Sequence, residues 1–422
     1  MPKNKKKKHQ SDTGLTNGQA TASGMDVVPK LAEDDASSVV SSMDGSTYGD
    51  YGMTGDDGRM VDDTSSDDQE VIHLEDLLLE NIDLLSDKST KNRLSAFTYV
   101  DKTFCQKVVT DLLTGRVLGL MEVVNKGIKK ASGGERCQTA RMAMLTSVQL
   151  GTEFDLVSTK PILSSVMADG NVSAMERAMC ITALGFCMFM ASEDSLEVVK
   201  VMEEFEACYN DRRLHADVIL AAINSWCLLL TVAPSVFVRK LVERQFPVLQ
   251  TLLGSDATAV KIASGQAISL LVEIARDHDM DVDGECIELA DVLQDLAADS
   301  NRYKGRKDRT QQRSCFRDFV QTVEDGTVPE KQIKVGSETL QLDSWSRIVQ
   351  YGAFRELLGN GLHTHLLSNE LVREVFGMGP IPVVTPADRH MEKMEKKYYN
   401  AMYSKMRTQA RSKQRDKRSD FA

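Results

Sequence analysis

Two concentrated runs of basic residues could bind an anionic partner, although the 422-residue chain has a formal net charge of −11. The first run covers residues 301–319. Its five arginines are spaced 4, 3, 4 and 4 residues apart: Arg302, Arg306, Arg309, Arg313 and Arg317. This spacing places the guanidinium groups along one face of a helix. Forked guanidinium groups suit phosphate oxygens, so the run favours an anion-binding helix over an ordinary solvated helix face.

The other side of this predicted helix is apolar and should pack against the rest of the domain. It carries Phe316, Phe319, Val320 and Val323. Gly305 weakens a helical turn, so we expect the helix to begin just after it.

A second long helix is predicted at the end of the chain. Thr385 can cap it, Pro386 fits its first position, and no further proline or glycine follows, so it can run to about residue 418. The second basic run supplies its cations, which are Lys405, Arg407, Arg411, Lys413, Arg415, Lys417 and Arg418. This part has nothing apolar to bury, and we expect it to become ordered against phosphates, as basic arms do on RNA. A nuclear-localisation signal is the alternative.

Other patterns that could carry chemistry are incomplete. Residues 279–290 match an EF-hand calcium loop at its first, third, fifth and sixth positions, but Ala290 stands where the bidentate glutamate is required. His363 and His365 are two residues apart, so on a helix they point to different sides. The sequence has no Gly-rich phosphate loop, nucleophile elbow or zinc-protease motif. We therefore expect no metal site, no cofactor, no small-molecule substrate and no catalytic residues.

The charge distribution limits the possible binding partners, and the cysteines indicate the cellular compartment. Residues 33–70 hold twelve acidic residues and one base, Arg59, so this stretch accounts for a charge of −11 and the rest is nearly neutral. An acidic total therefore does not exclude an anionic partner. The eight cysteines show no C-x-x-C spacing and stand in apolar surroundings, as buried thiols in a reducing compartment do. We expect a cytoplasmic protein, with the nucleus as a second location, and neither a signal peptide nor a membrane span.

A recurring helical element predicts the fold class. Its small residue is an alanine flanked by apolar residues, at Ala96, Ala143, Ala183, Ala222 and Ala267, with spacings of 47, 40, 39 and 45 residues. Helical repeats of the armadillo and HEAT type have periods of about 40–47 residues. The sequence therefore predicts an all-α, armadillo/HEAT-like helical-repeat solenoid.

Four regions follow from these patterns. Residues 1–70 are expected to form a disordered acidic tail, and 71–326 the repeat domain. Residues 327–384 are expected to form a compact module with a strand-like opening and two helices broken by "GNG", and 385–422 the basic C-terminal helix.

With these pieces placed, the chain resembles the interferon-related developmental regulator family. The resemblance is carried by "RSCFRDF" at 313–319, "SNE" followed by "VFGMGP" within 368–380, and "ARSKQRDKRSD" at 410–420. It implies an armadillo-like domain, a compact C-terminal region and no established catalytic residues.

The resemblance also implies two functional descriptions. One is a ribosome-bound inhibitor of translation whose C-terminal helix occupies the mRNA path of inactive ribosomes. The other is a nuclear transcriptional co-regulator that acts in differentiation through protein partners such as deacetylase complexes. The basic C-terminal helix suits a polyanionic channel, so we expect the ribosome, with its rRNA and ribosomal proteins, to be the partner.

Overall fold

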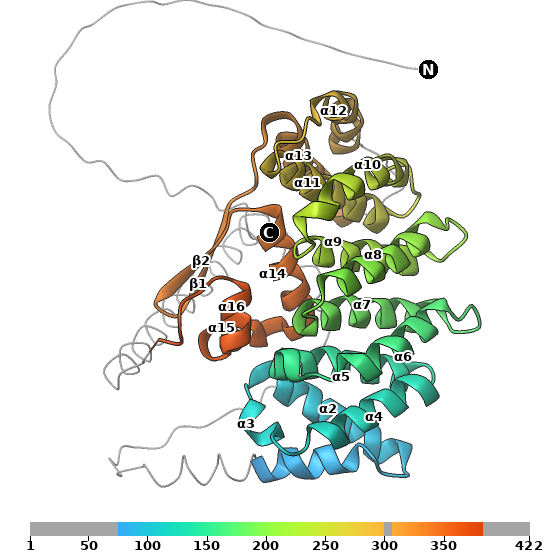
Figure 1. The fold of residues 1–422 in the computed structure, drawn as a ribbon, viewed down its shortest axis with the longest axis vertical. Helices are drawn as coiled ribbons and strands as arrows, with labels where there is room; N and C mark the ends of the chain where they lie inside the picture. Colours follow the sequence, from blue (N-terminus) through green and yellow to red (C-terminus); the bar gives the residue numbers. More distant parts are fainter. Residues whose placement is uncertain (1–74, 299–305, 383–422) are drawn as a thin grey trace, which may run out of the picture. The chain divides into compact units, whose positions relative to one another are not determined.

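The computed structural model describes residues 75–298 and 306–382 (Figure 1). A helix over residues 75–84 precedes a long series of helices. These are α2 (Thr90–Gln106), α3 (Thr110–Leu113), α4 (Val117–Lys130), α5 (Gly134–Leu150), α6 (Leu156–Ala168), α7 (Ala174–Ala191), α8 (Ser195–Asn210), α9 (Ala216–Leu230), α10 (Ser235–Leu252), α11 (Thr258–Asp277), α12 (Asp283–Ala298) and α13 (Arg306–Asp325).

These helices form two rows. The central row consists of α2, α5, α7, α9, α11 and α13, each packed against the next. The flanking row consists of α4, α6, α8, α10 and α12, and each of its helices packs against the central helix that follows it in sequence (Figure 1). The predicted helical-repeat architecture is confirmed.

The repeated alanines lie where the central helices meet. Ala96, Ala143, Ala183, Ala222 and Ala267 are all buried, one in each of α2, α5, α7, α9 and α11. A small side chain there lets successive helices approach closely. At Gly185 in α7 the approach is tighter still, because a Cβ atom would lie 2.6 Å from the Cβ atom of Ser225 in α9.

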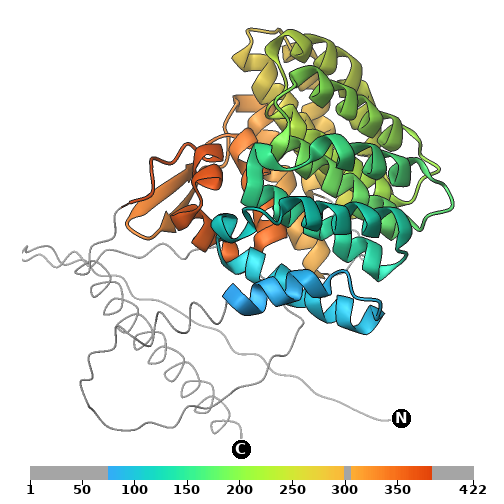
Figure 2. The same ribbon diagram turned by 60° about the horizontal axis from the view of Figure 1, so that its bottom comes forward.

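The residues after α13 form a module against the other side of the central row. An antiparallel hairpin of β1 (Lys331–Val335) and β2 (Glu338–Leu342) pairs Lys331 with Leu342. It is followed by α14 (Trp345–Leu358), a 3-10 turn at Gly359–Gly361, α15 (Leu362–Ser368) and α16 (Glu370–Val375). The helix α14 packs against α2, α5, α9 and α11, so the central row lies between the flanking row and this module (Figures 1 and 2).

Burial from two sides explains the composition of the central helices. In α5, every residue from Met142 to Leu150 is buried. A stretch of helix that is buried on all sides, with mostly apolar and small side chains, lies inside a domain rather than on its surface. Two central helices, α7 and α11, are long and apolar enough to cross a membrane, yet 56% and 67% of their apolar windows are buried inside the domain.

Specific polar contacts fix the module in place. The Arg141 guanidinium in α5 donates to the carbonyl oxygen of Leu357 at 2.6 Å and pairs with Asp101 at 2.6 Å. The Nδ2 group of Asn369 donates to the carbonyl oxygen of Val148 at 3.1 Å. Gly361 lies directly against the carbonyl group of Cys105, which leaves no room for a side chain.

Candidate nucleic-acid interface

The helix α13 ends the central row, and its apolar side is anchored as expected. Phe316, Phe319 and Val323 are buried, and Val320 is half-buried. The Phe316 and Phe319 rings meet edge to face with centroids 5.3 Å apart, and Phe319 also contacts Trp345 of α14 at 5.5 Å. This packing holds α13 between the last repeat and the C-terminal module.

The arginine side of α13 is only partly described. Arg317 is exposed and Arg313 is half-buried. Arg306 and Arg309 belong to the start of α13, where the structure describes the backbone but not these side chains. Arg302 lies outside the described residues, as do the seven cations from Lys405 to Arg418. Their contact with nucleic acid therefore stays a prediction.

A lysine from the hairpin adds positive charge close to α13. The Lys331 ammonium is exposed and attracts the Asp318 carboxylate. Burial raises the pKa of Asp318, and Lys331 offsets only part of this rise. Arg317 of α13 and Lys331 of the hairpin are therefore two exposed cations of one region, with Asp318 as a nearby carboxyl group.

The EF-hand-like segment and the histidine pair can be compared with the metal sites that their sequences suggest. Because α12 begins at Asp283, the second half of the EF-hand-like segment is helical rather than a loop. His363 is exposed, whereas His365 is buried with its Nε2 atom 2.9 Å from the carbonyl oxygen of Phe104. Burial lowers the pKa of His365. Within 75–298 and 306–382, no three metal-binding side chains gather at one point.

Comparison with known proteins decides the family. The profile described as interferon-related developmental regulator matches residues 37–324, and that of the interferon-related protein conserved region matches 369–419. Interferon-related developmental regulator 2 of Mus musculus is 36% identical over 385 residues, which cover 86% of each chain. This chain belongs to the interferon-related developmental regulator family.

Further relatives and a solved structure are similar to all or part of the chain. Interferon-related developmental regulator 1 of Mus musculus is 32% identical, and the alignment covers 100% of this chain and 99% of the relative. An uncharacterized protein of Schizosaccharomyces pombe is 27% identical over 150 residues, 31% of this chain and 34% of its own. A designed armadillo repeat protein gives a TM-score of 0.38 with 12% identity and covers 57% of this chain and 98% of its own.

The two family matches correspond to recognisable parts of the fold. The first ends at residue 324, next to the last residue of α13. The second begins at Asn369, which caps α16 by accepting a hydrogen bond from the backbone N–H of Val372. The hairpin and α14 lie between the two matches.

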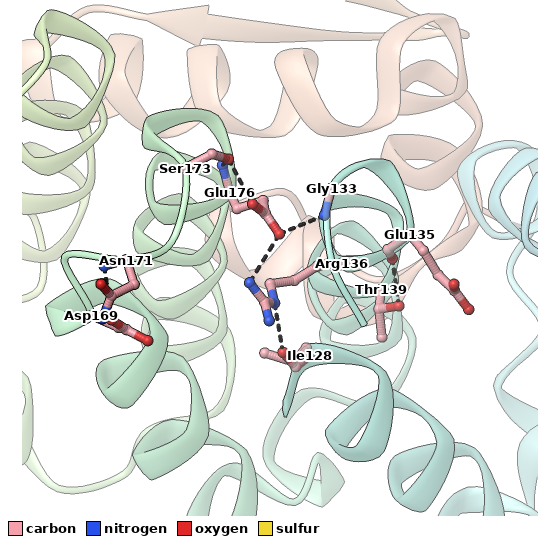
Figure 3. A network of polar contacts seen from close by, with 9 residues as sticks. All are labelled: Ile128, Gly133, Glu135, Arg136, Thr139, Asp169, Asn171, Ser173 and Glu176. Atoms are coloured by element: carbon pink, nitrogen blue, oxygen red, sulfur yellow. Dashed lines mark hydrogen bonds and ion pairs between the residues drawn. The ribbon is translucent and has the colours of Figure 1, made fainter. Parts of the chain in front are cut away.

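A series of arginine–glutamate ion pairs between successive repeats, here called the ladder, was not predicted from the sequence. In this family member, Arg136 near the start of α5 donates to Glu176 near the start of α7 at 2.9 Å, and to the carbonyl oxygen of Ile128 at 3.0 Å (Figure 3). Glu176 also accepts from the Gly133 backbone amide at 2.6 Å.

The preceding repeat carries the equivalent link. Arg93 near the start of α2 donates to Glu135 in the first turn of α5 at 2.7 Å. Arg93, Arg136 and Arg177 are spaced 43 and 41 residues apart, and each donates to a backbone carbonyl that precedes its own helix. That spacing was available in the sequence as a second repeat signal beside the alanines.

Proposed function

We propose that this member of the interferon-related developmental regulator family is a non-enzymatic, ribosome-binding regulator that represses translation. In this proposal the basic segment 385–422 enters the rRNA-lined mRNA path of inactive ribosomes. The observation that carries the proposal is the clustering of cations in two short runs of a chain whose other residues are acidic on balance. A regulator family and a helical-repeat fold are both typical of non-enzymes.

The chemistry of the two runs supports an RNA partner. Lys405, Arg407 and the five later cations fall within 14 residues, with Asp416 the one acidic residue between Lys405 and Arg418. The closely spaced cations of such a segment repel one another, and binding to the phosphate groups of RNA neutralises this repulsion. Neutralising about six phosphates makes the affinity fall steeply as salt is added.

The described domain favours a supporting role for α13. Arg317 and Lys331 are exposed, and both belong to elements that the buried phenylalanines and the hairpin pairing hold in place. Cations on rigid elements can contact phosphate without first being ordered. We infer that these residues position the domain on rRNA, while ribosomal proteins contact its other surfaces.

Ribosome co-sedimentation tests the proposal. The full chain, a chain lacking 387–422, and a chain with the seven cations from Lys405 to Arg418 changed to glutamine are incubated with purified ribosomes at low salt. The full chain should pellet with ribosomes and inhibit translation of a reporter mRNA in a lysate, and both variants should lose the two activities. Normal binding and repression by either variant would contradict the proposal.

Cell fractionation separates this proposal from the alternative. Sucrose-gradient fractions of a lysate should contain the protein in the ribosomal peaks, with release at high salt. A salt-tolerant nuclear complex without ribosomes would instead favour the transcriptional co-regulator.

A further inference from the structure

Four exposed aliphatic side chains recur at one position of the flanking helices. They are Leu118, Val157, Leu196 and Val236, and each is the second residue of its helix, in α4, α6, α8 and α10. Their exposed fractions are 84%, 86%, 57% and 75%. The spacings are 39, 39 and 40 residues, so the feature repeats with the period of the fold.

The core does not explain this row. The same helices bury other aliphatic residues two to six positions later, among them Leu120, Leu163, Val198 and Val238. A single exposed leucine is ordinary on a protein surface, whereas apolar residues that line up on one surface mark an interaction site. Here the alignment follows from the fold, because α4, α6, α8 and α10 succeed one another along the stack (Figures 1 and 2).

The length of the row fits a helix. The four helices pack on α5, α7, α9 and α11, and each of these central helices packs against the next. Packed helices lie about 8–10 Å apart, so three intervals give a row of roughly 30 Å. A helix of about 20 residues has the same length at 1.5 Å per residue. An amphipathic helix that places an apolar residue at about every second turn, roughly 10 Å apart, can contact all four members.

Charge defines the chemistry of that helix. Exposed Glu153 precedes Val157 by four residues, and exposed Glu193 precedes Leu196 by three. Neither carboxylate takes part in a hydrogen bond or ion pair among the described residues. Asp155 and Asp194 add further negative charge, although they also cap α6 and α8. Basic side chains are also present: Lys160 of α6 and Lys200 of α8 both pair with Glu197, and Arg239 and Lys240 are exposed on α10.

We propose that this row, Leu118, Val157, Leu196 and Val236, is a docking surface for an amphipathic helix of a partner protein. The partner helix carries basic residues beside the middle of its apolar stripe. This complements the acidic residues at α6 and α8. The inference does not depend on ribosome binding through α13 or the C-terminal segment, because none of those residues belongs to the row.

The charges argue against two other occupants. In a two-fold dimer formed through this row, the middle of the row lies nearest the axis, so the acidic residues of both copies would face each other. An anionic membrane surface is repelled by the same carboxylates. A basic helix satisfies both the apolar and the acidic features.

A designed peptide tests the surface directly. The probe is a helical peptide of about 20 residues, the length of the row at 1.5 Å per residue, with leucines at helical spacing, lysines on both flanks and a central benzophenone residue. A matched peptide carries glutamates in place of the lysines. Binding to the full chain is measured by fluorescence anisotropy, and the crosslinked site is mapped by mass spectrometry.

The row variant combines Leu118→Ser, Val157→Thr, Leu196→Ser and Val236→Thr. The control variant changes Met175, Ile287 and Val292, which are exposed apolar residues outside the row, to serine or threonine. Because all these side chains face solvent, thermal unfolding should be nearly unchanged in both. We expect the row variant to bind the lysine peptide at least tenfold more weakly and the control variant to bind within twofold of the original chain.

Variants of the acidic residues and the positions of the crosslinks complete the test. Glu153→Gln with Glu193→Gln should weaken lysine-peptide binding several-fold at low salt, and crosslinks should map to the first turns of α6 and α8. Equal binding of the glutamate peptide, or unchanged affinity in the row variant, would overturn the proposal. Two other results would also overturn it. One is that the original chain self-associates in sedimentation experiments and the row variant does not. The other is that the original chain floats with anionic vesicles and the row variant does not.

Discussion

The Glu273 carboxylate in α11 accepts a hydrogen bond from the backbone amide of Trp345, the first residue of α14, at 2.6 Å. It also accepts from the Ser346 amide at 3.2 Å. The first turn of a helix has amides without helical partners, and here a side chain 72 residues earlier satisfies two of them. Glu273 thereby joins the repeat array to the C-terminal module.

Removing this carboxylate should loosen the module. Glu273→Ala leaves two amides of α14 without their acceptor, and we expect a loss of about 1–3 kcal/mol in the free energy of unfolding. Asp343→Asn is the control, because Asp343 is 61% exposed in a 3.6 Å pair with Arg347 and should cost at most about 0.5 kcal/mol. Urea unfolding monitored by tryptophan fluorescence measures both. Equal stability of the two variants would show that Glu273 does not fix α14.

The link between Arg136 and Glu176 should stabilise the repeat interface strongly. Their side chains are only 12% and 7% exposed, so Glu176→Ala leaves a guanidinium group without its charge partner in a mostly buried place. We expect a loss of about 3 kcal/mol. Asp211→Ala removes the partner of Arg213, which is 90% exposed, and should change stability by less than about 1 kcal/mol. Comparable losses in the two variants would contradict this reasoning.

The same glutamate predicts a dependence on pH. Hydrogen bonds from Ser173 and the Gly133 amide lower the pKa of Glu176 below its ordinary value of 4.5, and the positive charge of Arg136 lowers it further. Burial acts in the opposite direction and raises the pKa. A lowered folded-state pKa gives stability that is present above the ordinary value and is lost as the pH falls through the folded value. The stability difference between the original chain and Glu176→Gln should therefore be constant near neutral pH and shrink below pH 4.5. A difference that grows on acidification would reverse the assigned sign.

Two helical glycines should respond in opposite directions to the same change. Gly185→Ala places a Cβ atom 2.6 Å from Ser225 between α7 and α9, and we expect a loss of about 1–3 kcal/mol. Gly119→Ala in α4 has no neighbouring atom within 4 Å and should stabilise the helix by about 0.5–1 kcal/mol. Thermal melts of the two variants measure the difference. Stabilisation by Gly185→Ala would show that the two helices can separate at little cost.

The cations at α13 should affect the salt dependence of ribosome binding. Arg317→Gln with Lys331→Gln removes two exposed charges, and the slope of log affinity against log salt should decrease by about one for each phosphate that is no longer neutralised. Arg239→Gln with Lys240→Gln removes the same charge from exposed positions on α10 and should leave the slope unchanged. Identical slopes in the two double variants would remove α13 from the interface.

Periodicity in the sequence predicted the repeat helices and their close contacts. Ala143 and Ala222 were placed at helix interfaces from spacing alone, because a repeated fold repeats its packing requirement. The buried side of α13 was predicted from Phe316 and Phe319 in the same way. The ladder of arginines and glutamates has a comparable period but was not predicted, because a charged residue is as common on a solvated helix face as in a link between repeats.

Contacts between distant segments could not be predicted from spacing. Arg373 is 1% exposed, and its guanidinium reaches Glu338 and the carbonyl oxygens of Leu366, Gly379 and Pro380. In sequence it looks like any surface arginine of a short helix. Only the docking of the hairpin against α16 makes it a buried centre, and no local pattern encodes that docking.

The position of α14 changes how the array can come apart. In an open solenoid each unit touches only its immediate neighbours, so the ends can fray while the middle stays folded. Here α14 touches α2, α5, α9 and α11, and its Trp345 also contacts Phe319 of α13, so units at both ends of the array are joined through one helix. Unfolding of the first unit therefore also removes contacts that stabilise the last unit. The domain should unfold in one cooperative transition rather than repeat by repeat.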